Sequence, residues 1–175
     1  MHYVINKARS DQKGFSLIEL LIVVVIIGVI AAIAIPNLLS ARRSANEGSA
    51  VSAMRTLHGA QMTYASTVGN GNYAGGTSFS ILALRELGTP GARIIDDSLD
   101  TGTKSGYNFV GIRTANSPTT PAQFAFSASP TTTTGARQTG TRRFGVSTDG
   151  VIKSDATLAQ YGTLLQVQNA SPHTN

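Results

Sequence analysis

The sequence feature that most constrains this chain is an uninterrupted apolar segment near its N-terminus. From Leu20 to Ile35 every residue is apolar or glycine, and Phe15 begins the run. As an α-helix, the segment from Phe15 to Ile35 would rise roughly 30 Å at about 1.5 Å per residue, which matches a hydrocarbon core of ~30 Å. Apolar residues cover all of its faces, so lipid or other helices must surround it. The segment is therefore predicted to span a bilayer.

A single carboxylate, Glu19, stands inside this run. A charge in such surroundings needs a partner or a function. If the chain is cut after Gly14, Phe15 becomes the first residue and Glu19 falls in the first helical turn. There the unpaired N–H groups and the positive end of the helix dipole favour a carboxylate. The new α-amine is a further partner, on the same chain or on a neighbouring helix shifted along its axis. The second arrangement would set the register between identical subunits.

Two simpler interpretations of the segment do not account for Glu19. A secretory signal also has a basic head and an apolar middle, and Ala32-Ile33-Ala34 resembles a small-x-small cleavage site. Such signals have an apolar middle of only ~7–15 residues, however, and no acid within it. A plain signal anchor would share the usual flanks of a membrane span. Both interpretations leave the carboxylate without a role and are disfavoured.

Residues 13–45, KGFSLIELLIVVVIIGVIAAIAIPNLLSARRSA, resemble the start of type IV prepilins and of the related pseudopilins of type II secretion. In that family a peptidase removes a short basic leader that ends in glycine, and the new first residue is N-methylated. Gly14 and Phe15 match this cleavage junction, and Phe15 matches the methylated residue. Glu19 matches the acid used in filament assembly. Gly28 and Pro36 stand where the family often has helix-weakening residues.

The resemblance implies a function as well as processing sites. We expect a structural subunit of a type IV pilus, processed by a prepilin peptidase and polymerised through its N-terminal helix into a helical homo-oligomer. The implied partners are membrane lipids before assembly and an inner-membrane assembly platform. The implied location is the bacterial inner membrane, as a single-pass protein, and then an extracellular pilus. The alternatives are a type II secretion pseudopilin in a periplasmic pseudopilus and, from another class, a membrane-anchored binding protein that does not polymerise.

The pattern beyond the apolar run divides the chain into further segments. Residues 1–14 are the expected leader and 15–36 the transmembrane or filament-core helix. Residues 37–68 continue that helix with an apolar stripe at spacings of three, four and seven, formed by Ala50, Met54, Leu57, Tyr64 and Val68. Two glycines, Gly48 and Gly59, each cost this half ~1 kcal/mol against alanine. Packing on a folded domain must therefore support it.

The remaining segments predict a small antiparallel sheet. Residues 69–104 form a glycine-rich connection with a short helix that Ser78 would cap and Gly88 would end. Residues 105–155 hold three strand candidates with alternating aromatic or apolar residues, at 106–112, 123–128 and 142–148, and VIK follows the hairpin signal Asp149-Gly150. Residues 156–175 form a C-terminal tail with a polar, frayed end. The expected fold is α+β, with the long helix packed on three or four strands: a pilin fold.

Composition argues against catalysis, cofactors and nucleic acid. The 175 residues include no cysteine, so there is neither a disulfide nor a thiolate metal site, and a formal charge of +5 is too mild to indicate a specific nucleic-acid partner. His58 and His173 are the only histidines after the leader, and neither is placed like a catalytic base. The acidic loop around Asp96 lacks the full pattern of a calcium site and reads as a solvated turn. Arg42 and Arg43 more plausibly meet lipid headgroups than DNA. No enzyme, metal or cofactor is expected.

Overall fold

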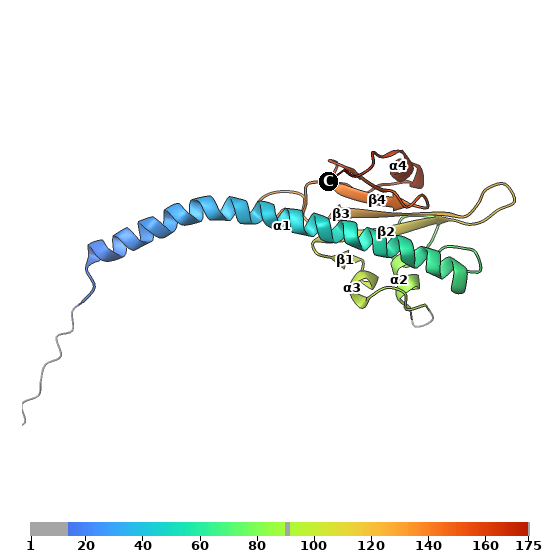
Figure 1. Ribbon diagram of the computed structural model, residues 1–175, viewed down its shortest axis with the longest axis horizontal. Coiled ribbons are helices and arrows are strands. Elements are labelled where there is room, and N and C mark those ends of the chain that lie inside the picture. Colours follow the sequence, from blue (N-terminus) through green and yellow to red (C-terminus); the bar gives the residue numbers. More distant parts are fainter. Residues whose placement is uncertain (1–13, 90–91, 175) are drawn as a thin grey trace, which may run out of the picture. The chain divides into compact units, whose positions relative to one another are not determined.

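The computed structural model describes residues 14–89 and 92–174. The chain divides into two compact units, residues 1–38 and residues 39–175, called here the N-terminal unit and the C-terminal unit. One helix, α1 (Leu17–Thr67), belongs to both (Figure 1). The other elements all lie in the C-terminal unit: α2 (Leu82–Gly88), α3 (Asp97–Asp100), β1 (Thr103–Lys104), β2 (Tyr107–Thr114), β3 (Gln123–Pro130), β4 (Arg143–Ser147), β5 (Ile152–Asp155) and α4 (Leu164–Asn169).

Helix α1 confirms that the apolar run and the amphipathic stretch form one continuous helix. It passes through Pro36 without ending, although proline has no N–H to donate to the carbonyl four residues earlier. The stripe predicted from sequence is buried at Ala50, Met54 and Leu57, which are all 0% exposed, but Val68 lies beyond the end of the helix and is 48% exposed. The stripe therefore packs on the core as far as Tyr64, which is partly buried, and only Val68 lies outside it.

The sheet is an antiparallel meander in the order β1-β2-β3-β4-β5 within the described residues. Phe109 pairs with Ala128 and Phe126 pairs with Val146, so the alternating residues fall on one face as predicted. The structure adds a short edge strand, β1, to the three or four strands expected. A turn joins it to β2 with positive φ at Ser105 (47°) and Gly106 (74°). Two residues are too few to give a period-two signal, and sequence analysis therefore missed it.

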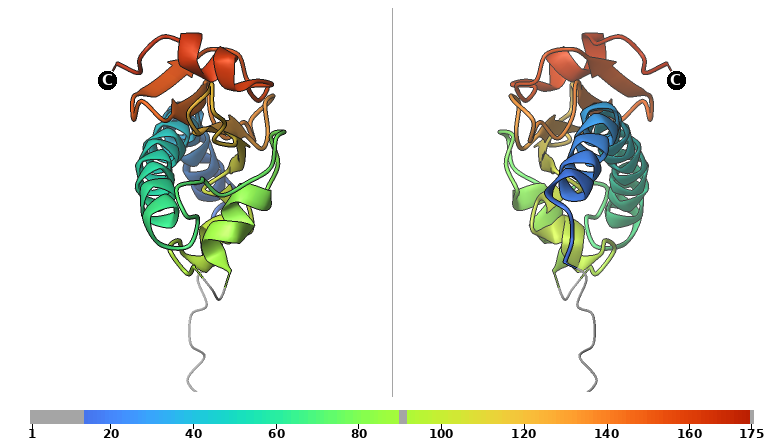
Figure 2. Two further views of the ribbon diagram at one scale, coloured as in Figure 1. Left: turned by 90° about the vertical axis from the view of Figure 1, so that its right-hand side faces the viewer. Right: turned by 90° about the vertical axis from the view of Figure 1, so that its left-hand side faces the viewer.

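Different elements pack on the two faces of the sheet. The main core joins the stripe of α1 and the buried side of α2 to Phe109, Phe126 and Phe144. A smaller cluster on the other face packs Val167 of α4 and Tyr161 against Ala125 of β3. Figure 2 shows α4 on the side of the strands away from the green helices. The sheet is therefore buried on both faces, which explains why β3 reads as almost continuously buried rather than alternating.

Both edges of the sheet are occupied by non-strand segments. Ser80 exchanges two backbone hydrogen bonds with Gly111 of β2, at 3.0 and 2.9 Å. At the other edge the backbone N–H of His173 donates to Ile152 of β5 at 2.8 Å, and Ser154 donates to Ser171 at 3.0 Å. The expectation of a frayed C-terminal end is therefore wrong up to residue 174, because these bonds hold it along β5. These bonds occupy backbone groups of β5 and of part of β2 that strands of other chains could otherwise pair with.

The predicted cap of α2 is also wrong. The helix begins after Ile81, which provides no side-chain cap, and Ser78 lies outside it. The hydroxyl of Ser80 accepts a hydrogen bond from the Leu82 N–H at 3.3 Å instead. Pairing of the Ser80 backbone with β2 fixes where the chain can turn into the helix, so tertiary contacts override the local capping signal.

Candidate functional site: the N-terminal helix

The N-terminal end of α1 carries the residues singled out in the sequence. Gly14, Phe15 and Ser16 precede the helix in irregular conformation, and the N–H of Leu20 donates to the carbonyl of Ser16 at 3.2 Å. Glu19 lies in the first turn. The first N–H groups of a helix have no intrahelical acceptor and carry the positive end of its dipole, so a carboxylate is favoured there. The structure thus brings Gly14, Phe15 and Glu19 to one helix end.

Side chains along this part of α1 are exposed to an extent that soluble proteins avoid. Phe15 is 82% exposed, and the large apolar side chains from Leu17 to Ile35 are between 49% and 84% exposed. The helix is long and apolar enough to cross a membrane, and none of its most apolar 18-residue stretch is buried within the described chain. An apolar surface this large requires lipid or protein to cover it.

Gly28 and Pro36 lie further along the same helix. They follow Glu19 by about 2.5 and about 4.7 turns at 3.6 residues per turn, so they do not share its helix end. Apart from its chain neighbours and the nearby backbone of α1, no described atom comes within 4 Å of the place where a Cβ would stand at Gly28. Neither residue breaks α1 in this structure. Their role as a weak segment remains a prediction.

The two histidines of the C-terminal unit are structural. His58 is half-buried with its ring 5.6 Å from that of Phe124, and its Nε2 has no hydrogen-bond partner within the described residues. His173 packs edge-on against Phe144, and its Nδ1 lies 3.1 Å from the Ser154 hydroxyl. Burial, together with the positive charge of Arg142, lowers the pKa of His173. Within residues 14–89 and 92–174 neither ring is hydrogen-bonded to a carboxylate, as the histidine of a Ser-His-Asp triad would be.

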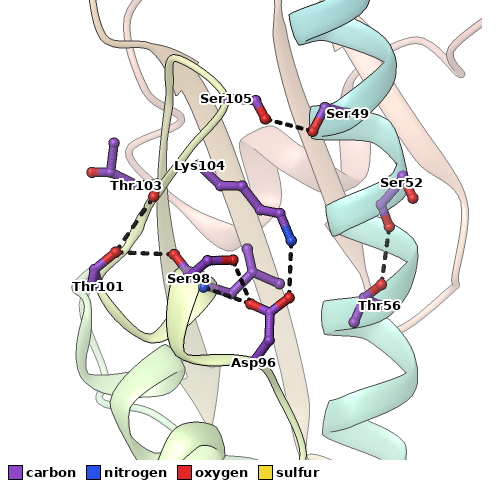
Figure 3. Close-up of polar contacts among 10 residues, drawn as sticks. Ser49, Ser52, Thr56, Asp96, Ser98, Thr101, Thr103, Lys104 and Ser105 are labelled. Carbon is purple, nitrogen blue, oxygen red and sulfur yellow. Dashed lines mark hydrogen bonds and ion pairs between the residues drawn. The ribbon is translucent and has the colours of Figure 1, made fainter.

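Asp96 has a structural role, as Figure 3 shows. Its carboxylate caps α3 by accepting from the backbone N–H of Leu99 at 2.9 Å and also accepts from the Ser98 hydroxyl at 2.7 Å. Lys104 of β1 donates to it at 3.0 Å. The hydrogen bonds from Ser98 and Lys104 lower the pKa of Asp96 to about 2. Within residues 14–89 and 92–174 no group of three or more acidic, histidine or cysteine side chains could hold a metal ion.

A second ion pair sits on the α4 side of the sheet. Arg143 donates to Asp155 at 2.9 and 2.7 Å and stacks on the ring of Tyr161, 3.8 Å from its centroid. Burial raises the pKa of Asp155, but the hydrogen bonds from Arg143 and Thr157 and the charge of Arg143 together outweigh it, so the pKa is lowered. The pair ties β4 to β5. Sequence analysis gave no signal for it, because the partners are joined only by strand register.

An apolar helix of spanning length, exposed on every side and joined to a small α+β domain, defines a membrane-anchored or helix-assembled class of protein. Comparison with known proteins narrows this class. Residues 9–35 match the family model described as the prokaryotic N-terminal methylation motif. The chain is 62% identical over 37 residues to the type IV wide pilus major component PilA4 of Thermus thermophilus, covering 21% of this chain and 28% of that protein.

Two further relatives extend the match. The chain is 40% identical over 58 residues to the type II secretion system core protein G of Escherichia coli, covering 33% of this chain and 40% of that protein. It is 39% identical over 60 residues to the type IV major pilin protein PilA of Myxococcus xanthus, covering 34% of this chain and 27% of that protein. The chain thus spans well under half the length of the curated relatives that it matches. No solved structure matches it.

These matches, which cover about a third of the chain or less, support a relation to the type IV pilin and type II secretion pseudopilin family. The resemblance noted in the sequence is confirmed. The expectation of a non-enzymatic protein agrees with these matches, because the matched proteins are pilus components and a secretion-system core protein. The apolar helix and the motif fit a pilin-like protein that is anchored in the inner membrane.

Proposed function

We propose that this protein is a structural subunit of a type IV pilus, cut by a prepilin peptidase and polymerised from the inner membrane through α1. One observation carries the proposal: the segment that matches the methylation motif continues as a helix whose apolar surface the chain leaves exposed. The bilayer covers that surface first. Copies of the same helix cover it in the filament.

Processing supplies the chemistry at the helix end. Cleavage between Gly14 and Phe15 creates an α-amine with a reference pKa of ~7.7–8.0, which can be cationic at neutral pH. N-methylation of Phe15 keeps the amine basic. Glu19 then pairs with the Phe15 amine of its own chain or of a neighbouring subunit. In the neighbouring arrangement the contact is charge-assisted and selects one axial offset among apolar helices that would otherwise slide.

The energetics of transfer explain why such a contact is needed. Lipid tails are as apolar as the side chains of α1, so moving the helix from lipid to a bundle of its copies gains little hydrophobic free energy. Van der Waals packing and polar contacts must provide the order. A bend or local melting between Gly28 and Pro36 would let the helix adapt to the bundle, since Pro36 removes one backbone donor.

A type II secretion pseudopilin is the second candidate. The match to the Escherichia coli core protein G supports it, since at 40% identity over 58 residues it is about as good as the match to the major pilin PilA of Myxococcus xanthus, 39% over 60 residues. A pseudopilin would use the same helix and the same processing but end in a periplasmic pseudopilus. A membrane-anchored binding protein that does not polymerise is the candidate from another class.

Shearing the cells separates the three candidates. Surface filaments are sheared off, pelleted and probed with antibody against the C-terminal unit, and the membrane fraction is probed in parallel. A pilin is recovered in long sheared filaments. Retention of the protein in the envelope under conditions where the cells bear pili contradicts the pilus proposal. Cross-linked ladders in that envelope fraction would then identify a pseudopilin, and monomers alone an anchored protein.

A further inference from the structure

A cleft of about 500 Å³ opens in the C-terminal unit where α1 enters it. One wall is the first turns of α1 in this unit, and the other is the loop between β3 and β4. The lining residues are Leu39, Arg42, Asn46, Thr132, Ala136, Arg137, Gln138 and Thr139. The cleft therefore brings together a helical arginine and a loop arginine that are far apart in sequence.

Hydrogen bonds fix the loop beside the helix. Asn46 Nδ2 donates to the carbonyl of Thr139 at 2.9 Å, and Arg43 Nε donates to that of Gln138 at 3.4 Å. Glu47 accepts from both the backbone N–H and the hydroxyl of Thr141 at 2.7 Å. Three successive contacts along α1 thus hold one stretch of loop, so the cleft is built into the fold.

The charge of the cleft is positive and uncompensated. Arg42 and Arg137 are both exposed, and neither forms an ion pair or a side-chain hydrogen bond with any other described residue. Among the residues that the structure describes, no carboxylate lines the cleft. The nearest acid on α1 in sequence, Glu47, is engaged by Thr141 and by Arg142 at 3.4 Å. Guanidinium groups favour anions, and their planar fork of N–H donors suits phosphate geometry in particular.

The place of the cleft along α1 indicates where that phosphate comes from. The uninterrupted apolar run ends at Ile35, and Leu38 and Leu39 are the next large apolar residues, past Pro36 and Asn37. Leu39 lines the cleft, and Arg42 follows Leu39 by about 4.5 Å along the helix axis at 1.5 Å per residue. The headgroup layer on each side of the hydrocarbon core is about 5–8 Å thick. When the helix spans a bilayer up to Leu39, Arg42 stands at headgroup level, and arginine side chains keep their charged end in that layer.

We propose that this cleft binds the phosphate of an anionic phospholipid headgroup while α1 spans the membrane. Arg42 and Arg137 hold the phosphate from two sides, and Leu39 contacts the start of the acyl chains. This binding anchors the loop of the C-terminal unit at the membrane surface and so adds a lipid contact to the span itself. The inference rests on the membrane-inserted stage of the proposed function and not on the filament.

Native mass spectrometry of the full chain in detergent tests the proposal. Phosphatidylglycerol, which carries a net negative charge, is compared with zwitterionic phosphatidylcholine at equal concentration. We expect a preferred phosphatidylglycerol adduct on the wild type and a loss of about tenfold or more in its bound fraction for Arg42→Gln/Arg137→Gln, because two charge-assisted phosphate contacts are removed. Arg42→Lys/Arg137→Lys should be intermediate, since lysine keeps the charge but not the planar fork.

The matched control is Arg85→Gln/Arg93→Gln, which removes the same charge from two exposed arginines outside the cleft and should leave the adduct unchanged. Equal adducts on wild type and the Arg42/Arg137 variant, an equal loss in the control, or no preference over phosphatidylcholine would overturn the proposal. Displacement of the lipid by millimolar inorganic phosphate would reassign the cleft to a free anion. Filament yield from sheared cells is scored separately, so failure of the pilus proposal is distinguishable from failure of this one.

Discussion

Replacing Gly59 by alanine should stabilise the C-terminal unit. Gly59 is exposed in the interior of α1, and apart from its chain neighbours and the nearby backbone of α1 no described atom lies within 4 Å of the place where its Cβ would stand. The added methyl group therefore meets no neighbour. Glycine in a helix interior costs ~0.8–1.0 kcal/mol relative to alanine. The main reason is that an unfolded chain with glycine has more backbone freedom, and so loses more of it on folding, than the same chain with alanine. We expect the free energy of unfolding to rise by about 0.5–1 kcal/mol.

Gly111 provides the opposite case from the same reasoning. A Cβ at this position on β2 would lie 2.6 Å from Cε1 of Phe126 and 2.7 Å from Cβ of Ala83, both fully buried. Neither neighbour can retreat without disturbing the core, and overpacking of this kind costs typically 1–3 kcal/mol. Gly111→Ala should therefore destabilise the unit, although alanine is the better strand residue. The space around each glycine, rather than its helix or strand propensity, decides whether alanine stabilises or destabilises the unit.

The assay is thermal unfolding of the full chain in detergent, followed by near-ultraviolet circular dichroism. Near-ultraviolet signals report the packing of tyrosines in the C-terminal unit, whereas far-ultraviolet signals would be dominated by a detergent-bound helix that does not melt. For a unit of this size Gly59→Ala should raise the melting temperature by about 2–5 °C. A lower melting temperature for Gly59→Ala, or an unchanged one for Gly111→Ala, would refute the reasoning.

Four further predictions concern processing, assembly, helix dynamics and pH. Intact mass should show a mature chain beginning at Phe15, methylated at its amine; a chain beginning at Ile35 would instead establish an ordinary signal peptide. Glu19→Val should remain processed and membrane-inserted but be nearly absent from sheared filaments, with Glu19→Asp intermediate, because the mutation removes the charge that selects the axial offset; wild-type filament yield would exclude the assembly role. Hydrogen exchange in α1 should be fastest at residues 28–36, and slow exchange there in assembled filaments would count against local melting. Since the folded pKa of His173 is lowered, its contribution to stability is complete above its unfolded value of ~6.5 and is lost as the pH falls through and below it. His173→Asn should flatten that part of the stability profile, measured by urea unfolding, and an unaltered profile would assign the titration elsewhere.

Much of the fold could be predicted from periodicity. The apolar run and the stripe at Met54 and Leu57 indicate one long helix with a partner on one side of its second half, and the structure has both. Alternating aromatic residues and the Asp149-Gly150 turn indicate a meander, and the observed pairing of Phe126 with Val146 follows it. These features are local, since each depends on the spacing of residues within one element.

The elements that sequence analysis missed are short and depend on distant partners. Strand β1 has two residues, α3 has four and α4 has six. Segments of this length carry too few residues for a period to appear, and nothing local in them favours one conformation strongly. The end of the chain follows the same rule. Its polar composition predicts fraying, but backbone bonds to β5 hold His173 in place.

The candidate sites also divide into those that a local pattern predicts and those that depend on distant contacts. The sequence by itself determined the processing and assembly candidates, Gly14, Phe15 and Glu19, because they lie within a few residues of one another at the start of a segment whose transfer free energy is decided by composition alone. Their roles remain predictions. The cleft between Arg42 and Arg137 exists only because Asn46 and its neighbours bind a loop that is remote in the chain. The hydrogen bond from Arg43 to Gln138, for example, joins residues that are 95 positions apart. The packing of the whole unit determines such contacts, and no local pattern of residues predicts them.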